Sequence, residues 1–142
     1  MSKIGFFIRF TLTYALVMAA AGITISILEV KSASSLNTVL LMAVAYWFFY
    51  SFSTKNSRII EGNEKWSLIF LALAGDVLTS VVLGVPAMLA NDLPLGYFLI
   101  GLAIITPLHF LVLVVVSFGV KRILTKHHPD RVKGQQAVSG GE

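Results

Sequence analysis

The chain has 142 residues, of which 56% are hydrophobic and 13% are charged, and its formal net charge is +4. A soluble domain carries about 25% charged residues, so this composition excludes an ordinary water-soluble globular protein. The positive residues stand at the ends of long apolar runs and form no basic domain, so nucleic acid is not an expected partner. The absence of cysteine excludes disulfide bonds and thiolate metal sites.

Four apolar runs predict four transmembrane helices, at about residues 4–28, 34–53, 66–90 and 95–121. An apolar helix of about 18 or more residues spans a hydrocarbon core of about 30 Å, because each residue adds about 1.5 Å. We therefore predict an all-α membrane protein whose four-helix transmembrane domain covers residues 1–124. The links after the first and third helices are short, which favours an antiparallel bundle.

The first run follows Lys3 and contains Arg9. Its apolar pattern continues to Leu28, beyond the roughly 7–15 residues of a secretory signal, so we expect an uncleaved helix. Arg9 lies near the start of the run, where its long side chain can reach the lipid headgroups. A specific contact of Arg9, with Asp76 or with a lipid phosphate, is the alternative.

The second run ends in the aromatic segment Tyr46–Tyr50, and Trp66 opens the third run. Tyr and Trp favour the level of the lipid headgroups, so these residues are predicted to anchor the helix ends. Between the two runs, residues 53–65 form a predicted cytoplasmic loop of mixed charge. This loop is predicted to fold over the bundle, with Arg58 and Glu64 available as an ion pair.

Asp76, in the third run, is the residue that costs most to place in a membrane. It lies about 16 Å along the helix from Lys65, near the middle of the bilayer, where a carboxylate costs about 2.5–3.5 kcal/mol. Such a group must be protonated, paired or in contact with water. Thr79 and Ser80 belong to the same stripe of small and polar residues, which is typical of a face that packs on another helix.

His109, in the fourth run, lies about 18 Å from Lys121 and therefore at nearly the depth of Asp76. Three interpretations of these two residues stay open: a hydrogen bond that only fastens two helices, a titrating functional site, or no contact. No catalytic, cofactor-binding or metal-binding motif accompanies them, so we expect neither an enzyme nor a cofactor nor a metal site. Residues 125–142 are polar and basic and are predicted to form a disordered cytoplasmic tail.

The distribution of charge predicts the orientation of the chain in the membrane. Four helices place both termini on one side, together with ten of the eleven Lys and Arg residues. The opposite side keeps only Lys31, next to Glu29. Because positively charged loops stay in the cytoplasm, both termini are predicted to be cytoplasmic.

A set of residues in the first two thirds of the chain resembles a known family. Phe7–Phe10 reads Phe-Ile-Arg-Phe, and Tyr14, an aromatic second helix, Asn-Ser-Arg at residues 56–58 and Glu64 follow in that order. This order is similar to that of a family of small bacterial membrane proteins named after an Acinetobacter locus. The resemblance covers roughly residues 6–85 and implies four helices in a bacterial inner membrane, but it implies no particular function.

Three functions are compatible with the sequence. The favoured one is binding to another membrane-inserted protein, as an accessory subunit or as an immunity protein against a membrane-acting toxin. The alternative is a homo-oligomeric transporter or channel that uses Asp76 and His109, and a lipid-directed membrane enzyme is the third. Small residues recur at helix-packing spacing, Ala15 with Ala19, Gly22 with Ser26 and Ser80 with Gly84, and they fit either internal packing or self-association.

Overall fold

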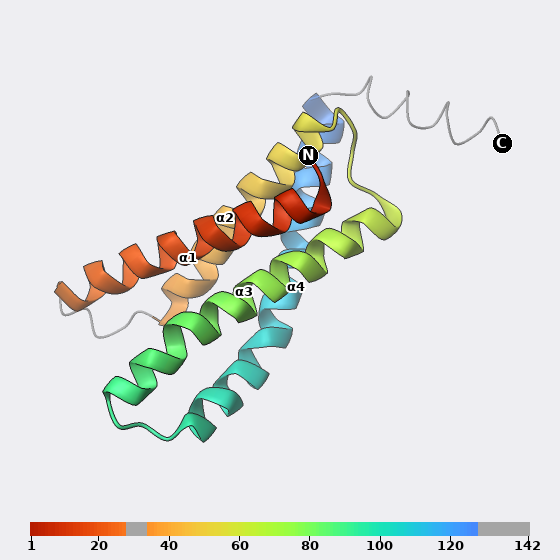
Figure 1. The fold of residues 1–142 in the computed structure, drawn as a ribbon. Helices are drawn as coiled ribbons and strands as arrows, with labels where there is room; N and C mark the ends of the chain where they lie inside the picture. Colours follow the sequence, from red (N-terminus) through yellow and green to blue (C-terminus); the bar gives the residue numbers. More distant parts are fainter. Residues whose placement is uncertain (28–33, 128–142) are drawn as a thin grey trace.

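A computed structural model describes residues 1–27 and 34–127 of the chain (Figure 1). These residues form four helices: α1 (Lys3–Ile27), α2 (Ser34–Lys55), α3 (Gly62–Ala90) and α4 (Leu95–His127). Each helix is long and apolar enough to cross a membrane, which confirms the predicted all-α class with four candidate spans. The chain is thus a multi-pass membrane protein by length and composition of its helices.

Two helices extend beyond the bounds predicted from the apolar runs. α3 begins at Gly62, ahead of Trp66, and α4 continues to His127, so Thr125–His127 are helical and the prediction of disorder is wrong for them. The rest of the predicted tail lies outside the described residues. Polar residues can continue a helix in the headgroup region. Glu64 in the first turn of α3 and Lys126 in the last turn of α4 also interact favourably with the dipoles of their helices. With 29 residues in α3 and 33 in α4, both helices are therefore longer than the hydrocarbon core of a membrane is thick.

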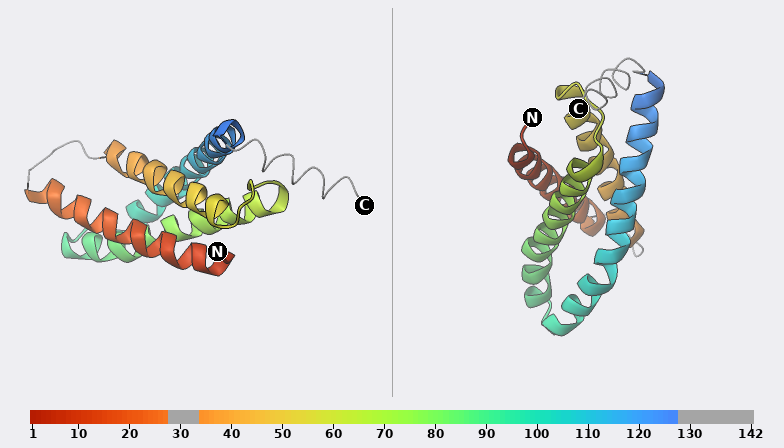
Figure 2. Two further views of the ribbon diagram at one scale, coloured as in Figure 1. Left: turned by 90° about the horizontal axis from the view of Figure 1, so that it is seen from above. Right: turned by 90° about the vertical axis from the view of Figure 1, so that its right-hand side faces the viewer.

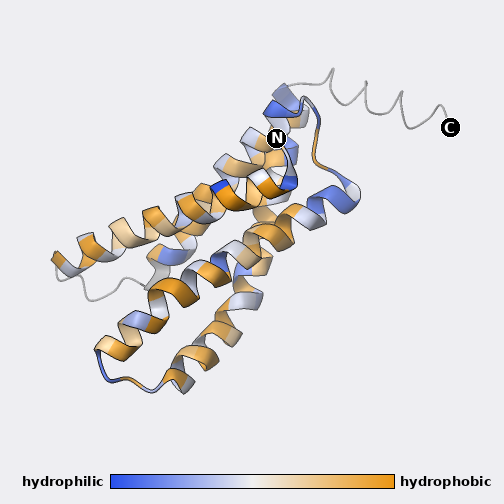
Figure 3. Cartoon of the chain, in the orientation of Figure 1, coloured by the Kyte–Doolittle hydropathy of each residue, from blue (hydrophilic) through white to orange (hydrophobic). Residues whose placement is uncertain are grey.

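The helices meet at one end of the molecule, which we call the basic end. The amino terminus donates a hydrogen bond to Asn56 just after α2, and Lys3 Nζ lies 3.3 Å from Ser67 Oγ near the start of α3. Lys121 Nζ, near the end of α4, lies 2.7 Å from Glu61 Oε1. Many hydrophilic residues lie at this end, and others lie along the helices and at the turn between α3 and α4 (Figure 3).

α1 and α4 each pack on both α2 and α3, and α2 also touches α3 across the bundle. α1 and α4 make no contact within the described residues, and the right-hand view of Figure 2 places α3 between them. The predicted neighbours, α1 with α2 and α3 with α4, are therefore confirmed. α1 packs on α3 at least as extensively as the helices of either of these two pairs pack on each other. The loop lengths did not predict this contact.

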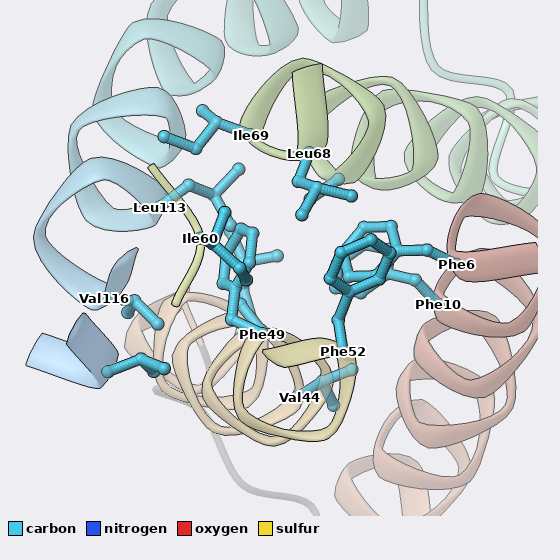
Figure 4. Close-up of a cluster of buried hydrophobic side chains, with 14 of the residues drawn as sticks. Phe6, Phe10, Val44, Phe49, Phe52, Ile60, Leu68, Ile69, Leu113 and Val116 are labelled. Atoms are coloured by element: carbon cyan, nitrogen blue, oxygen red, sulfur yellow. The ribbon is translucent and has the colours of Figure 1, made fainter. Parts of the chain in front are cut away.

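Aromatic side chains form the centre of the core near the basic end. Phe6, Phe10 and Tyr14 stack along one face of α1, with neighbouring ring centroids 5.8 and 5.9 Å apart. Phe6 also contacts Phe49 and Phe52 of α2, and side chains from all four helices and the loop converge there (Figure 4). Phe49, in the aromatic end of α2, is buried in this core and does not anchor at the headgroups. Trp47 is 66% exposed, and its anchoring at the headgroups stays a prediction.

The loop after α2 folds over this core, as predicted. Ile59 and Ile60 insert into it and are buried. The Ser53 carbonyl accepts a hydrogen bond from the Arg58 amide at 3.2 Å, which closes the turn. Arg58 Nη2 lies 2.5 Å from Glu64 Oε1, so the predicted ion pair is present at the surface.

The other half of the molecule has no comparable core. Among the described residues, none is buried in the second half of α1 (15–27), the last part of α3 (80–90) or the first part of α4 (95–108). We call these three segments the open half. Away from the basic end, α1 separates from the pair formed by α3 and α4 (Figure 1).

Candidate functional site at a buried aspartate and histidine

Asp76 of α3 and His109 of α4 meet where the packed half of the bundle gives way to the open half. Asp76 Oδ2 lies 2.7 Å from His109 Nδ1, and the two side chains are only 3% and 1% exposed. Asp76 lies about 21 Å along α3 from Gly62, so the pair is deep in the membrane span. The predicted contact between the two residues is present.

The small residues of α3 are what allow helices to approach around the aspartate. Ala72, Gly75, Asp76 and Thr79 are buried on one face of α3. A Cβ at Gly75 would lie 2.5 Å from Thr11 Oγ1 of α1, so the two backbones come closer than any larger residue permits. Close approach through small residues is the usual way in which membrane helices pack.

α2 and α1 complete the site with polar groups that the sequence did not single out. Thr38 Oγ1 of α2 lies 3.4 Å from His109 Nε2, so both ring nitrogens of the histidine have a polar neighbour. The Tyr14 hydroxyl of α1 donates a hydrogen bond to Asn37 Oδ1 at 2.5 Å and also lies within interaction range of the Asp76 carboxyl. Every helix therefore contributes at least one polar side chain. In the sequence, only their position as polar residues inside apolar runs could have indicated Thr38, Asn37 and Tyr14 as members of this site.

Three buried oxygen atoms at this level have no hydrogen-bond partner within the described residues: Asp76 Oδ1, Thr79 Oγ1 and Thr11 Oγ1. Thr11 faces Gly75 at the contact between α1 and α3, and Thr79 lies one helical turn from Gly75 on the buried face of α3. Each unpaired buried polar group costs about 1–3 kcal/mol, and such groups cluster where a protein holds a proton, an ion or a water molecule.

Two of the predicted site residues do not join the pair. Arg9 is exposed and forms no ion pair or hydrogen bond with any residue in the described ranges, so its proposed contact with Asp76 is absent and anchoring at the headgroups is the remaining interpretation. Ser80 is half-buried and takes no part in the polar contacts around Asp76. The ion pair of Arg58 and Glu64 is separate, at the basic end.

The pair combines a carboxyl and an imidazole in a buried site, so its net charge depends on how many protons the two groups hold. A carboxyl and an imidazole that share one additional proton are neutral together, whereas a carboxylate beside a neutral imidazole carries one negative charge into the bilayer. The core between Asp76 and the basic end is packed with aromatic side chains. Within one chain, the contact therefore joins α3 to α4 next to this packed core.

No protein-family model, curated protein or solved structure matches this chain. The similarity to the family of small bacterial membrane proteins accordingly stays a prediction.

Proposed function

We propose that this protein acts by binding another membrane-inserted protein, as an accessory subunit or as an immunity protein against a membrane-acting toxin. The observation that supports this proposal is the open half of the molecule. Its segments of α1, α3 and α4 contain no buried residue, although each continues for several turns beyond the core. The packed half, with its sealed Asp76 and His109 pair, would then serve as the rigid base that positions these helices.

The second half of α1 is the surface best suited to a partner helix. Gly22 is exposed, and no atom lies within 4 Å of the position that its Cβ would take. Ala15, Ala19 and Ser26 continue the small-residue spacing along the same helix, and none of them is buried. A small-residue face lets a second backbone approach closely, so one large side chain there should block the contact.

We expect Gly22→Leu to lower the recovery of the partner by about tenfold or more, because a bulky side chain prevents close helix approach. The measurement is affinity capture of the tagged full chain from its native membranes in polymer nanodiscs, with quantitative mass spectrometry. Gly119→Leu is the matched control, since Gly119 has equal open space but lies in the packed half. Equal recovery of the partner with the wild type and with Gly22→Leu would show that the second half of α1 is not the binding surface. The absence of any stoichiometric foreign protein would contradict the function itself.

A homo-oligomeric transporter or channel is the second candidate, and the three unpaired oxygen atoms around Asp76 favour it. It requires several copies, because four helices seldom enclose a pathway. Capture of the chain with only copies of itself would make it the leading proposal. Proton flux into proteoliposomes should then fall in Asp76→Asn, which keeps the shape of the side chain and removes its charge. Unchanged flux in that variant would remove Asp76 from the pathway.

We further propose a bacterial inner-membrane location and an antiparallel bundle with both termini in the cytoplasm. The charge asymmetry and the meeting of the helix ends at the basic end support this topology. The chain contains no cysteine, so single introduced cysteines report without background. A membrane-impermeant maleimide added to intact spheroplasts should label Asp92→Cys, whereas Ser2→Cys and Thr125→Cys should react only after permeabilisation. Labelling of Ser2→Cys in intact spheroplasts would show that the orientation is the reverse of the proposed one.

A further inference from the structure

A hollow of about 480 Å³ lies on the surface of the last turns of α4, at the basic end. Phe118, Lys121, Arg122, Thr125 and Lys126 line it. It is distinct from the Asp76 and His109 pair and from the open half, and nothing in the proposed partner contact uses it.

The residues of this hollow are ordered along the helix from apolar to charged. Phe118, Arg122 and Lys126 are spaced four residues apart, so they lie on nearly one line with a rise of about 6 Å between neighbours. Phe118 is exposed and lies nearest the membrane interior, and Arg122 and Lys126 follow toward the helix end. An aromatic ring followed by a guanidinium and an ammonium matches the order of acyl chain, phosphate and headgroup in a phospholipid.

The charge around the hollow is positive and largely uncompensated. Lys121 is paired with Glu61, but Arg122 and Lys126 form no ion pair with any residue of the described ranges. Lys65 of α3 adds a further ammonium, 4.5 Å from the centroid of the Phe118 ring. Lys65 thus lies against the exposed ring, and Arg122 and Lys126 line the hollow together with it. Arg in particular offers paired donors to phosphate oxygens.

We propose that this hollow is a binding site for an anionic phospholipid, with the lipid phosphate between Arg122 and Lys126 and the start of an acyl chain along Phe118. Free phosphate would satisfy the two basic side chains but would leave the ring unused. The lipid is therefore the occupant that accounts for all three residues.

The test is native mass spectrometry of the full chain in detergent, titrated separately with phosphatidylglycerol, phosphatidylcholine and inorganic phosphate. We expect phosphatidylglycerol to bind more tightly than phosphatidylcholine. The double substitution Arg122→Gln with Lys126→Gln should weaken phosphatidylglycerol binding by about 25-fold, at about fivefold for each basic residue. Phe118→Ala should weaken binding of the lipid and leave any binding of inorganic phosphate unchanged.

The matched control is the double substitution Lys3→Gln with Lys55→Gln, which removes the same charge at the same end of the molecule. It should change phosphatidylglycerol binding by less than about twofold, because neither residue lines the hollow. Circular dichroism melting of both doubles checks that α4 stays folded. An equal loss in the two doubles would mean general attraction between charges and would overturn the site. Inorganic phosphate binding as tightly as the lipid would overturn the lipid as its occupant.

Discussion

Replacing His109 with leucine is expected to lower the free energy of unfolding by about 3 kcal/mol, because Asp76 is then left as a buried carboxyl without its partner. One oxygen of this carboxyl already has no hydrogen-bond partner among the described residues, so the loss of His109 leaves the other oxygen without its partner as well. The measurement is unfolding in mixed micelles with increasing SDS, followed by circular dichroism and by the fluorescence of Trp66, which stacks on Phe110 beside His109.

A double-mutant cycle separates the contact from the cost of the isolated charge. The combination of Asp76→Ala with His109→Leu should be less destabilised than His109→Leu alone, because it leaves no buried carboxyl. Ser80→Ala, half-buried on the same helix, should change stability by less than about 0.5 kcal/mol. Additive effects of the two single substitutions would show that Asp76 and His109 are not coupled, and the pair would lose its role as a fastener of α3 and α4.

Gly75→Ala is expected to lower the free energy of unfolding by about 2 kcal/mol, although alanine is the better helix former. The new methyl group would lie 2.5 Å from Thr11 Oγ1 and 3.1 Å from Phe10 Cδ1, so α1 must move away from α3. The same SDS unfolding measures the effect. Because α1 carries Tyr14 toward Asp76, this shift should also disturb the polar site.

Two further variants decide whether close approach is the cause. Gly101→Ala on α4 adds the same methyl group where no atom lies within 4 Å, and it should stabilise the protein by up to about 1 kcal/mol. Adding Thr11→Ala to Gly75→Ala removes the nearest clashing atom and should restore part of the loss. If Gly75→Ala behaves like Gly101→Ala, then α1 and α3 are not packed as closely as described.

The polar site shows which features of this protein follow from the local sequence and which depend on contacts between helices. The depths of Asp76 and His109 followed from helix rise alone. Their contact did not, because it also requires that the right faces of α3 and α4 meet, and only the tertiary structure shows this. Thr38 was not anticipated as a neighbour of His109, because the sequence does not show which face of α2 meets α4. Tyr14 could not be assigned either, because it continues the apolar line of Phe6 and Phe10 as readily as it serves a polar cluster.

The sequence by itself determined the number of helices, their order and the membrane as solvent, because a span needs a long apolar run that satisfies its own backbone hydrogen bonds. Rotation of each helix was decided only by the tertiary structure. A helix that is apolar on all sides carries no pattern that distinguishes the lipid face from the core, so Phe49 and Trp47 looked alike in sequence. The open half was likewise decided by packing, since an apolar run does not show where one helix meets another, as Thr11 of α1 meets Gly75 of α3.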